Sequence, residues 1–230
     1  MGIQGDMQVW RYMSFGSLVR LLETKKLWLS NAEYFSDKWE LVPDISQINS
    51  IMNNRPPTQS PEVTKNGIST YIKDLRKNAY INCWTASRHE SYALWKIYCP
   101  TSEGVVIQTT FEKLQESVPL PVLEVKYESY KANGKIPEVS ILVTQKRPIF
   151  SYEQEVRIVA IHDFSELTKN GTKMLGFDID WDPEIHLENI WIHPEATYWF
   201  ADTVTETVNR LAPKLGRHVP WSKISYSPPV

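Results

Sequence analysis

Cysteine is scarce in this sequence, and the two that are present, Cys83 and Cys99, are too far apart for a C-x-x-C motif. Two cysteines do not provide the disulfide framework of a small secreted domain, so the composition favours a reducing compartment. Residues 1–20 lack an apolar core of signal-peptide length, and no hydrophobic run approaches a membrane span. We therefore expect a cytoplasmic protein that does not contact a membrane.

Basic excess, phosphate-binding glycine loops and paired histidines are missing as well. The formal net charge of −2 argues against tight nonspecific binding to nucleic acid, although a local basic patch is compatible with it. The nine glycines form neither G-x-x-x-x-G-K-[ST] nor G-x-G-x-x-G. The five histidines are scattered, with no pair at i,i+4, so we expect no metal site.

Short strand-like and helical segments alternate without a regular βαβ rhythm. At 230 residues the chain is long enough for one large domain with a substantial core. The pattern predicts an α+β fold with a mixed, mostly antiparallel central sheet and flanking helices. Residues 43–62, which are rich in proline and asparagine, predict a flexible loop or lid. We expect strands at 8–13, 27–30, 79–86, 104–110, 122–127, 189–193 and 218–227, and helices at 15–22, 62–77, 90–99 and 199–211.

Two carboxylates stand at the start of a run that is otherwise typical of a buried strand. Residues 151–163 read SYEQEVRIVAIHD, and the part from Val156 onward is rich in β-branched residues. Side chains alternate along a strand, so Glu153, Glu155 and Arg157 are expected on one face. Buried carboxylates need partners. The group is therefore either a structural ion pair or part of a reactive site.

Two further short segments carry candidate site residues. Arg11 lies between aromatic residues in WRYMSF, where its guanidinium either pairs with a carboxylate or binds a phosphate. In CWTAS, Thr85 and Ser87 share a face where a strand ends. Their hydroxyl groups either cap the next helix or line a pocket.

The order of these motifs resembles a bacterial family catalogued as domain of unknown function two-nine-seven-one. The resemblance covers about residues 9–160, and one motif departs from the family pattern: F-N-D-P-F-E is FSDKWE here, with Ser36 and Lys38 in place of Asn and Pro. The family implies a bacterial cytoplasmic effector, in defence against phage or as a toxin in conflict. The matching residues are Arg11, Tyr12, Phe15, Trp28, Ser30, Asn31, Phe35, Asp37, Glu40, Cys83, Trp95, Tyr98, Gly104, Lys146, Tyr152, Glu153, Glu155 and Arg157.

A second resemblance is to ADP-ribosyltransferases, which combine an Arg or His on an early strand, an S-T-S-like strand and a late strand with E-x-E or Q-x-E. Arg11, the 85–87 segment and Glu153-Gln154-Glu155 occur in that order. The resemblance implies NAD as substrate, a macromolecular acceptor, either protein or nucleic acid, and no metal. It also implies an ADP-ribosyltransferase-like fold.

The resemblance assigns roles that fit the chemistry. Breaking the nicotinamide–ribose bond builds a positively charged sugar, which a fixed carboxylate stabilises. Glu155 is expected to bind a ribose hydroxyl and stabilise that cation, and Glu153 to orient or deprotonate the acceptor. Arg11 is expected to hold a phosphate. The other expected NAD-binding residues are Tyr12, Thr85, Ser87, Trp95 and Tyr98.

The same polar residues admit two other interpretations. Carboxylates beside a lysine suit hard-cation phosphoryl chemistry, as in a metal-dependent nuclease, but Lys146 precedes the glutamates rather than following them as in E-x-K. Alternatively, the group is a buried polar network in a non-enzymatic module that binds a nucleotide or nucleic acid. Both interpretations add Asp37, Glu40, Lys146 and Arg157 to the cluster.

Overall fold

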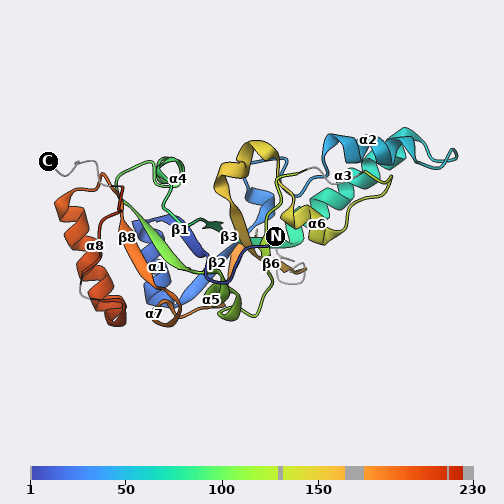
Figure 1. Ribbon diagram of the computed structural model, residues 1–230. Coiled ribbons are helices and arrows are strands. Elements are labelled where there is room, and N and C mark those ends of the chain that lie inside the picture. The colour runs from blue at the N-terminus through green and yellow to red at the C-terminus, as the bar shows by residue number, and fades with distance from the viewer. Residues whose placement is uncertain (1, 129–131, 164–173, 217, 225–230) are drawn as a thin grey trace.

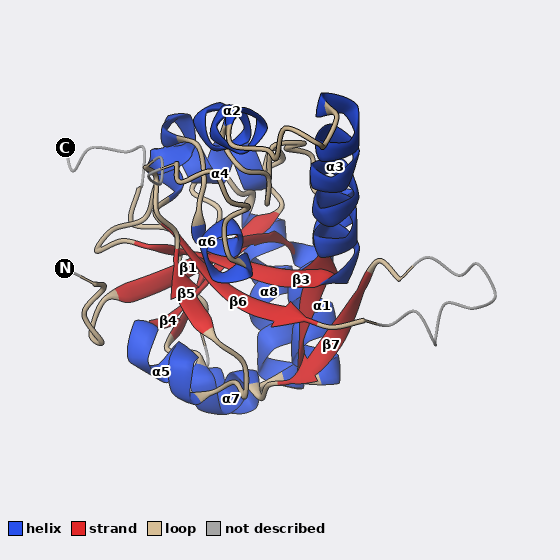
Figure 2. Cartoon of the chain, turned by 90° about the vertical axis from the view of Figure 1, so that its right-hand side faces the viewer, coloured by secondary structure: helices blue, strands red, loops and turns tan. Residues whose placement is uncertain are grey.

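The computed structural model describes residues 2–128, 132–163, 174–216 and 218–224. Its strands form one eight-stranded sheet in which every pairing between named strands is antiparallel. Helices lie on both sides of this sheet (Figure 2). The predicted α+β class is confirmed. The strands are β1 Gln8–Ser14, β2 Lys26–Asn31, β3 Ala79–Ala86, β4 Gly104–Thr110, β5 Val122–Glu124, β6 Glu155–Ile161, β7 Gly176–Asp180 and β8 Asn189–Ile192.

The helices differ in their relation to the sheet. Helices α2 and α3, which connect β2 to β3, project away from the sheet at the end opposite α8 (Figure 1). The α-helices are α1 Phe15–Thr24, α2 Ile45–Asn53, α3 Pro61–Asn78, α4 Tyr92–Tyr98, α5 Phe111–Glu116, α6 Val139–Thr144, α7 Pro183–His186 and α8 Tyr198–Leu211, and the short 3-10 helices are η1 Ala32–Tyr34, η2 Pro148–Glu153 and η3 Pro213–Leu215.

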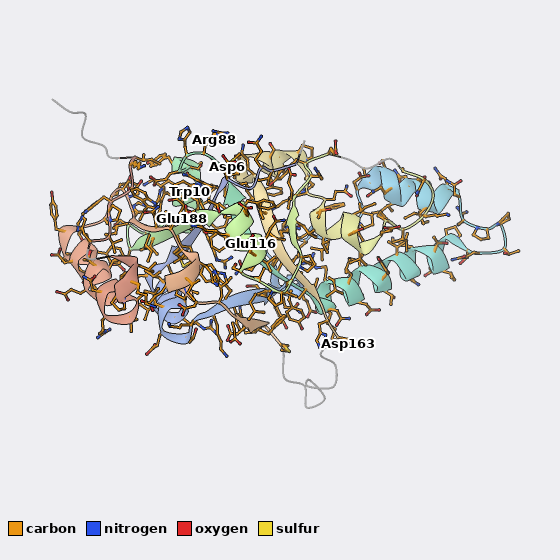
Figure 3. The ribbon with its side chains drawn as sticks, turned by 60° about the horizontal axis from the view of Figure 1, so that its bottom comes forward. Asp6, Trp10, Arg88, Glu116, Asp163 and Glu188 are labelled. Carbon is orange, nitrogen blue, oxygen red and sulfur yellow. The ribbon has the colours of Figure 1, made fainter. Side chains whose placement is uncertain are left out.

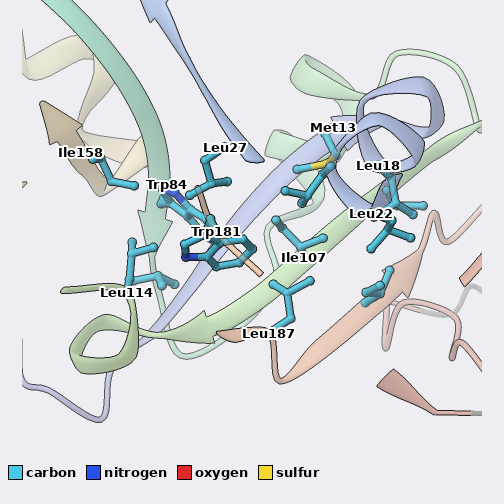
Figure 4. Close-up of a cluster of buried hydrophobic side chains, with 14 of the residues drawn as sticks. Met13, Leu18, Leu22, Leu27, Trp84, Ile107, Leu114, Ile158, Trp181 and Leu187 are labelled. Atoms are coloured by element: carbon cyan, nitrogen blue, oxygen red, sulfur yellow. The ribbon is translucent and has the colours of Figure 1, made fainter. Parts of the chain in front are cut away.

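The largest apolar core lies on the face of the sheet that α1 and α8 cover. Leu18 and Leu22 of α1 pack there with Ile107 of β4, and the Trp84 and Trp181 rings lie 6.1 Å apart (Figure 4). Burial of such side chains contributes roughly 1.5–3 kcal/mol each. This core fixes the central strands, which in turn carry the polar residues on the opposite face.

The sheet forks at β3. The main path of the sheet has the strand order β5-β6-β3-β1-β4-β8. A second branch starts at β3, which also pairs with β2, and β2 in turn pairs with β7. β1 pairs with β3 at Val9–Ala86 and Trp10–Thr85. β2 pairs with the other half of β3, at Ser30–Ile81. Between these two contacts, no strand of the described residues pairs with β3 on that side, and the sheet is open there.

The predicted elements correspond closely to the observed ones in the first half of the chain. Ser14 caps α1 by accepting a hydrogen bond from the Ser17 backbone N–H, as its position before the apolar pattern suggests. The predicted loop at 43–62 is wrong over α2, where Asp44 and Gln47 form a capping box.

The predicted final strand at 218–227 lies partly outside the described residues. In its described part, Trp221 makes one isolated bridge to Ile192. No helix in the described ranges has both the length and the apolar composition that crossing a bilayer requires.

Candidate functional site

A cavity of about 330 Å³ lies at the fork of the sheet. It collects side chains from β1, β3 and β6, from the segment after β2, from the end of α4 and from η2. Trp10, in the cavity wall, lies in the body of the molecule away from the projecting helices α2 and α3 (Figure 3). The lining residues are Trp10, Arg11, Tyr12, Ser30, Phe35, Ser36, Asp37, Glu40, Ile81, Cys83, Trp84, Thr85, Tyr98, Lys146, Phe150, Glu153 and Glu155.

Glu155 is held by two cations. Pairing of β3 with β6 sets Thr85 opposite Glu155 and Cys83 opposite Arg157, so these side chains share the face away from the main core. Arg157 donates from Nε to Glu155 Oε1 at 2.8 Å and from Nη2 to Oε2 at 3.0 Å. Lys146 Nζ donates to Oε2 at 2.9 Å. Glu155 is therefore a fixed, buried anion rather than a free carboxylate.

Glu153 reaches the same lysine from a different element. It ends η2, Gln154 takes a left-handed conformation with φ of 43°, and β6 begins at Glu155. The expectation that both glutamates lie on one strand is therefore wrong. Their carboxylates nevertheless converge, because Lys146 Nζ also donates to Glu153 Oε2. The turn at Gln154 places Glu153 beside Glu155. The second carboxylate oxygen of Glu153, Oε1, accepts a hydrogen bond from the Tyr98 hydroxyl at 3.2 Å.

Glu40 adds a third carboxylate to the group. Its Oε1 lies 2.6 Å from Arg157 Nη2, and its Oε2 lies 3.8 Å from Lys146 Nζ. We call Glu40, Glu153, Glu155, Lys146 and Arg157 the charged cluster. Three carboxylates and two cations leave it with one excess negative charge.

The pKa shifts of Glu155 and Lys146 keep these two groups ionised. Burial raises the pKa of Glu155, but the charge of Arg157 and then that of Lys146 outweigh it and lower the pKa to about 2. Burial lowers the pKa of Lys146, but the carboxylates of Glu155 and Glu40 raise it well above the ordinary value. Both groups are charged at neutral pH.

Arg11 lines the cavity and connects β1 to β3 at the fork. Its Nη1 donates to the Cys83 carbonyl oxygen at 2.8 Å, which replaces a hydrogen bond that a neighbouring strand would make. Burial lowers the pKa of Arg11, although this guanidinium stays protonated in practice. Burial and the neighbouring Glu155 raise the pKa of the Cys83 thiol, so it is not a thiolate nucleophile.

The other residues predicted for NAD binding separate into two groups. Tyr12, Thr85 and Tyr98 line the cavity, and Tyr98 is half-exposed at 48%. Ser87 lies in the turn after β3, where its hydroxyl accepts from the His89 backbone N–H at 3.2 Å. Trp95 is fully buried, and its indole N–H donates to Glu90. The structure therefore brings Ser87 and Trp95 into a turn and a core, not into the cavity.

Asp37 also lines the cavity, where it pairs with Arg147 at 3.0 Å. Four aromatic residues in the cavity lining were not among the predicted site residues: Trp10, Phe35, Trp84 and Phe150. Lys146 Nζ lies 5.1 Å from the centre of the Phe150 ring. Phe35 belongs to the FSDKWE motif, and Phe150 directly precedes the segment SYEQEVRIVAIHD; that proximity was the available signal.

Among the described residues, no group of three or more His, Cys, Asp and Glu side chains is arranged to hold a metal ion. In the charged cluster, Lys146 occupies the space between the three carboxylates. A divalent ion would have to displace this ammonium group. The arrangement is therefore a poor fit to the nuclease interpretation.

Comparison with known proteins gives a limited result. No protein-family model matches the chain, so the resemblance to the bacterial family stays a prediction. No curated protein matches it either. Two solved structures of DarT from Thermus sp. 2.9 are similar overall. The complex with ADP-ribosylated ssDNA has a TM-score of 0.45 and 11% identity, covering 97% of both chains. The complex with carba-NAD+ has a TM-score of 0.41 and 9% identity, covering 96% of this chain and 97% of that one. Scores at this level carry no conclusion about activity.

Proposed function

We propose that the protein is an ADP-ribosyltransferase that binds NAD in the cavity at the fork and transfers ADP-ribose to a macromolecular acceptor. The observation that carries the proposal is the charged cluster with its excess negative charge, facing a cavity that also presents Arg11 and aromatic rings. The volume of about 330 Å³ lies in the range of small-molecule sites. Consumption of NAD and modification of a macromolecule would both harm a cell, which suits a defence or conflict effector.

In the proposed reaction, nicotinamide leaves with the electron pair of the bond to ribose C1. A nucleophile of the acceptor then bonds to C1 and loses its proton. Between these events the sugar carries positive charge, which a fixed anion in a water-poor site stabilises. Glu155 is held ionised by Arg157 and Lys146, so it supplies that charge without reorganising.

Glu153 is the carboxylate with capacity to bind the substrate. A carboxylate offers about four acceptor sites. At Glu155, the acceptor sites are taken by Arg157 Nε, Arg157 Nη2, Lys146 Nζ and the Cys83 thiol. Glu153 accepts from Lys146 and Tyr98, which leaves room for a ribose hydroxyl or for the acceptor proton. We therefore assign ribose or acceptor contact to Glu153 and fixed negative charge to Glu155.

The test is incubation of the purified protein with NAD labelled on the adenylate phosphate, together with a cell lysate, with and without EDTA. We expect protein or nucleic acid to retain the label, and EDTA to have no effect. Glu153→Gln should lose transfer, because the neutral amide neither carries charge nor accepts a proton. Glu206→Gln is the matched control, since Glu206 is exposed on α8. Parental labelling by Glu153→Gln would contradict the assignment.

A non-enzymatic nucleotide-binding module is the second candidate, favoured by the near-complete pairing of Glu155. Under it, the charged cluster is structural and Arg11 alone recognises the ligand. The protein would then bind NAD, ADP-ribose or ADP without releasing nicotinamide. Measuring bound and cleaved NAD in the same sample separates the two candidates.

A further inference from the structure

Tyr98 brings a hydroxyl group into the cavity, beside the carboxylate to which we assign ribose or acceptor contact. It is the last residue of α4, it lines the cavity, and it is half-exposed. Its hydroxyl donates a hydrogen bond to Glu153 Oε1 at 3.2 Å. A hydroxyl group within hydrogen-bond distance of a carboxylate base is the arrangement of an activated nucleophile. The pair therefore has the geometry to attack an electrophile bound in the cavity.

Glu153 is placed to take up the proton of Tyr98. Its Oε2 accepts from Lys146 Nζ, whereas its Oε1 accepts from the Tyr98 hydroxyl. Partial burial and the charge of Glu153 raise the pKa of Tyr98, so the phenol is protonated at neutral pH. Attack by the phenol oxygen therefore needs a base that removes this proton while the new bond forms. Glu153 is the carboxylate in contact with that proton.

Cys83 also lines the cavity, but its partner is a poorer base. The thiol contacts Glu155. Burial raises the pKa of Glu155, but the charges of Arg157 and Lys146 outweigh it and lower the pKa to about 2, so this carboxylate takes up a proton with difficulty. Burial also raises the pKa of the thiol itself. Of these two nucleophiles, Tyr98 is therefore the one with an available proton acceptor.

Helix α4 holds Tyr98 in a fixed position. Trp95, one turn earlier, is fully buried, and its ring packs edge-on against Tyr12. At the start of the helix, the Ser91 backbone N–H donates to the Tyr12 hydroxyl at 2.7 Å. Cys99, which follows the helix, is buried as well. A nucleophile on an anchored helix loses little conformational freedom when it reacts.

We propose that Tyr98 is a self-modification site, at which the protein transfers ADP-ribose to its own phenol when no other acceptor is bound. The inference rests on the proposed function, which supplies the electrophile. Nicotinamide leaves ribose C1 with the electron pair of the broken bond. The phenol oxygen then bonds to C1, and its proton passes to Glu153 Oε1. Because the adduct is attached at the cavity wall, it blocks a second NAD, and self-modification limits turnover.

The experiment is incubation of the purified full chain with NAD labelled on the adenylate phosphate, without lysate, followed by denaturation and peptide mass spectrometry. We expect one ADP-ribosyl group per chain, on the peptide that contains Tyr98, and nicotinamide release that slows as this group accumulates. Tyr98→Phe should lose the adduct and continue to release nicotinamide, because Glu153 then activates water. Tyr92→Phe, at an exposed tyrosine of the same helix, is the control and should behave like the parent.

Thermal unfolding should show that Tyr98→Phe is folded, since the change removes one oxygen atom from a half-exposed side chain. An adduct on another residue, or label retained by Tyr98→Phe, overturns the inference and leaves the proposed function intact. Nicotinamide release by the parent at a constant rate, with no bound label, has the same meaning. A parent that binds NAD but releases no nicotinamide, either alone or with lysate, refutes the proposed function and the inference together.

Discussion

Replacing Lys146 by methionine would test the charged cluster from which the proposed chemistry is derived. Lys146 is 11% exposed at its side chain and lies between three carboxylates, at 3.8 Å from Glu40 and 2.9 Å from Glu155. Removing one partner from a buried ion pair costs about 3–5 kcal/mol, because the remaining charge stays buried without compensation. We expect Lys146→Met to lose about 3 kcal/mol of unfolding free energy at pH 7.

The pH dependence gives the sharper measurement. In the parent, the pKa of Glu155 is lowered to about 2 from 4.5, so its stabilising contribution is full above the unfolded value and is lost as pH falls toward 2. Without Lys146 the pKa of Glu155 lies closer to its unfolded value of 4.5, because one of the charges that lower it is gone. The stability deficit of the variant should therefore be smaller at pH 3 than at pH 7.

Urea unfolding followed by tryptophan fluorescence would measure both quantities. Lys65→Met on the exposed face of α3 is the control, with an expected change within about 0.5 kcal/mol. A deficit below about 1 kcal/mol at pH 7, or one that is equal at the two pH values, would show that Lys146 does not compensate the carboxylates.

Three further changes test the frame around the cavity. Arg76→Met removes three hydrogen bonds from a buried guanidinium to carbonyl groups of residues 32–40, so we expect a loss of about 3 kcal/mol by chemical denaturation and weaker NAD turnover. Gly104→Ala would place a Cβ 2.4 Å from the Cβ of Cys99, and it should lower the melting temperature by several degrees in a calorimetric scan. Asp44→Ala removes the cap of α2 and should cost about 1 kcal/mol, with Asp44→Asn largely preserving stability; equal losses in the two variants would argue against capping.

Much of the fold could be predicted because the local patterns agree with the tertiary structure. The strand 104–110 alternates little and is rich in β-branched residues, as expected for an inner strand buried on both faces, and its predicted bounds are those of β4. Helix α1 was recognisable from its Ser14 cap and apolar spacing. In contrast, residues 45–53 contain few strong helix formers, and the prolines and asparagines of residues 43–62 favoured a loop, whereas the structure has a helix that begins with a capping box at Asp44.

The composition of the site was largely predictable, and its geometry was not. Arg11, Thr85, Glu153 and Glu155 do line one cavity. The break in regular structure at Gln154 depends on a left-handed backbone conformation that glutamine does not signal. Lys146 lies outside the strands, so its place between the carboxylates follows from tertiary packing alone.

The place of Trp95 also follows from tertiary packing, which the sequence pattern does not reveal. Trp95 was grouped with the NAD-binding residues because it shares a motif with Tyr98. In the structure, Tyr98 contacts Glu153, whereas Trp95 packs edge-on against Tyr12 with ring centres 5.1 Å apart. Trp95 and Tyr98 are three residues apart, so they lie on the same side of the short helix one turn apart, and the sequence pattern did not distinguish their surroundings.

Release of nicotinamide from NAD by the purified protein tests the central claim most directly. Chromatography of the reaction should show nicotinamide accumulating with the parent and with Glu206→Gln, and a drop of at least about a hundredfold with Glu153→Gln, the range typical of losing one acid–base group. Glu155→Gln is less suitable, because it leaves the buried guanidinium of Arg157 without its bidentate partner. A folded parent protein that binds NAD but releases no nicotinamide in the presence of an acceptor-containing lysate would contradict the account.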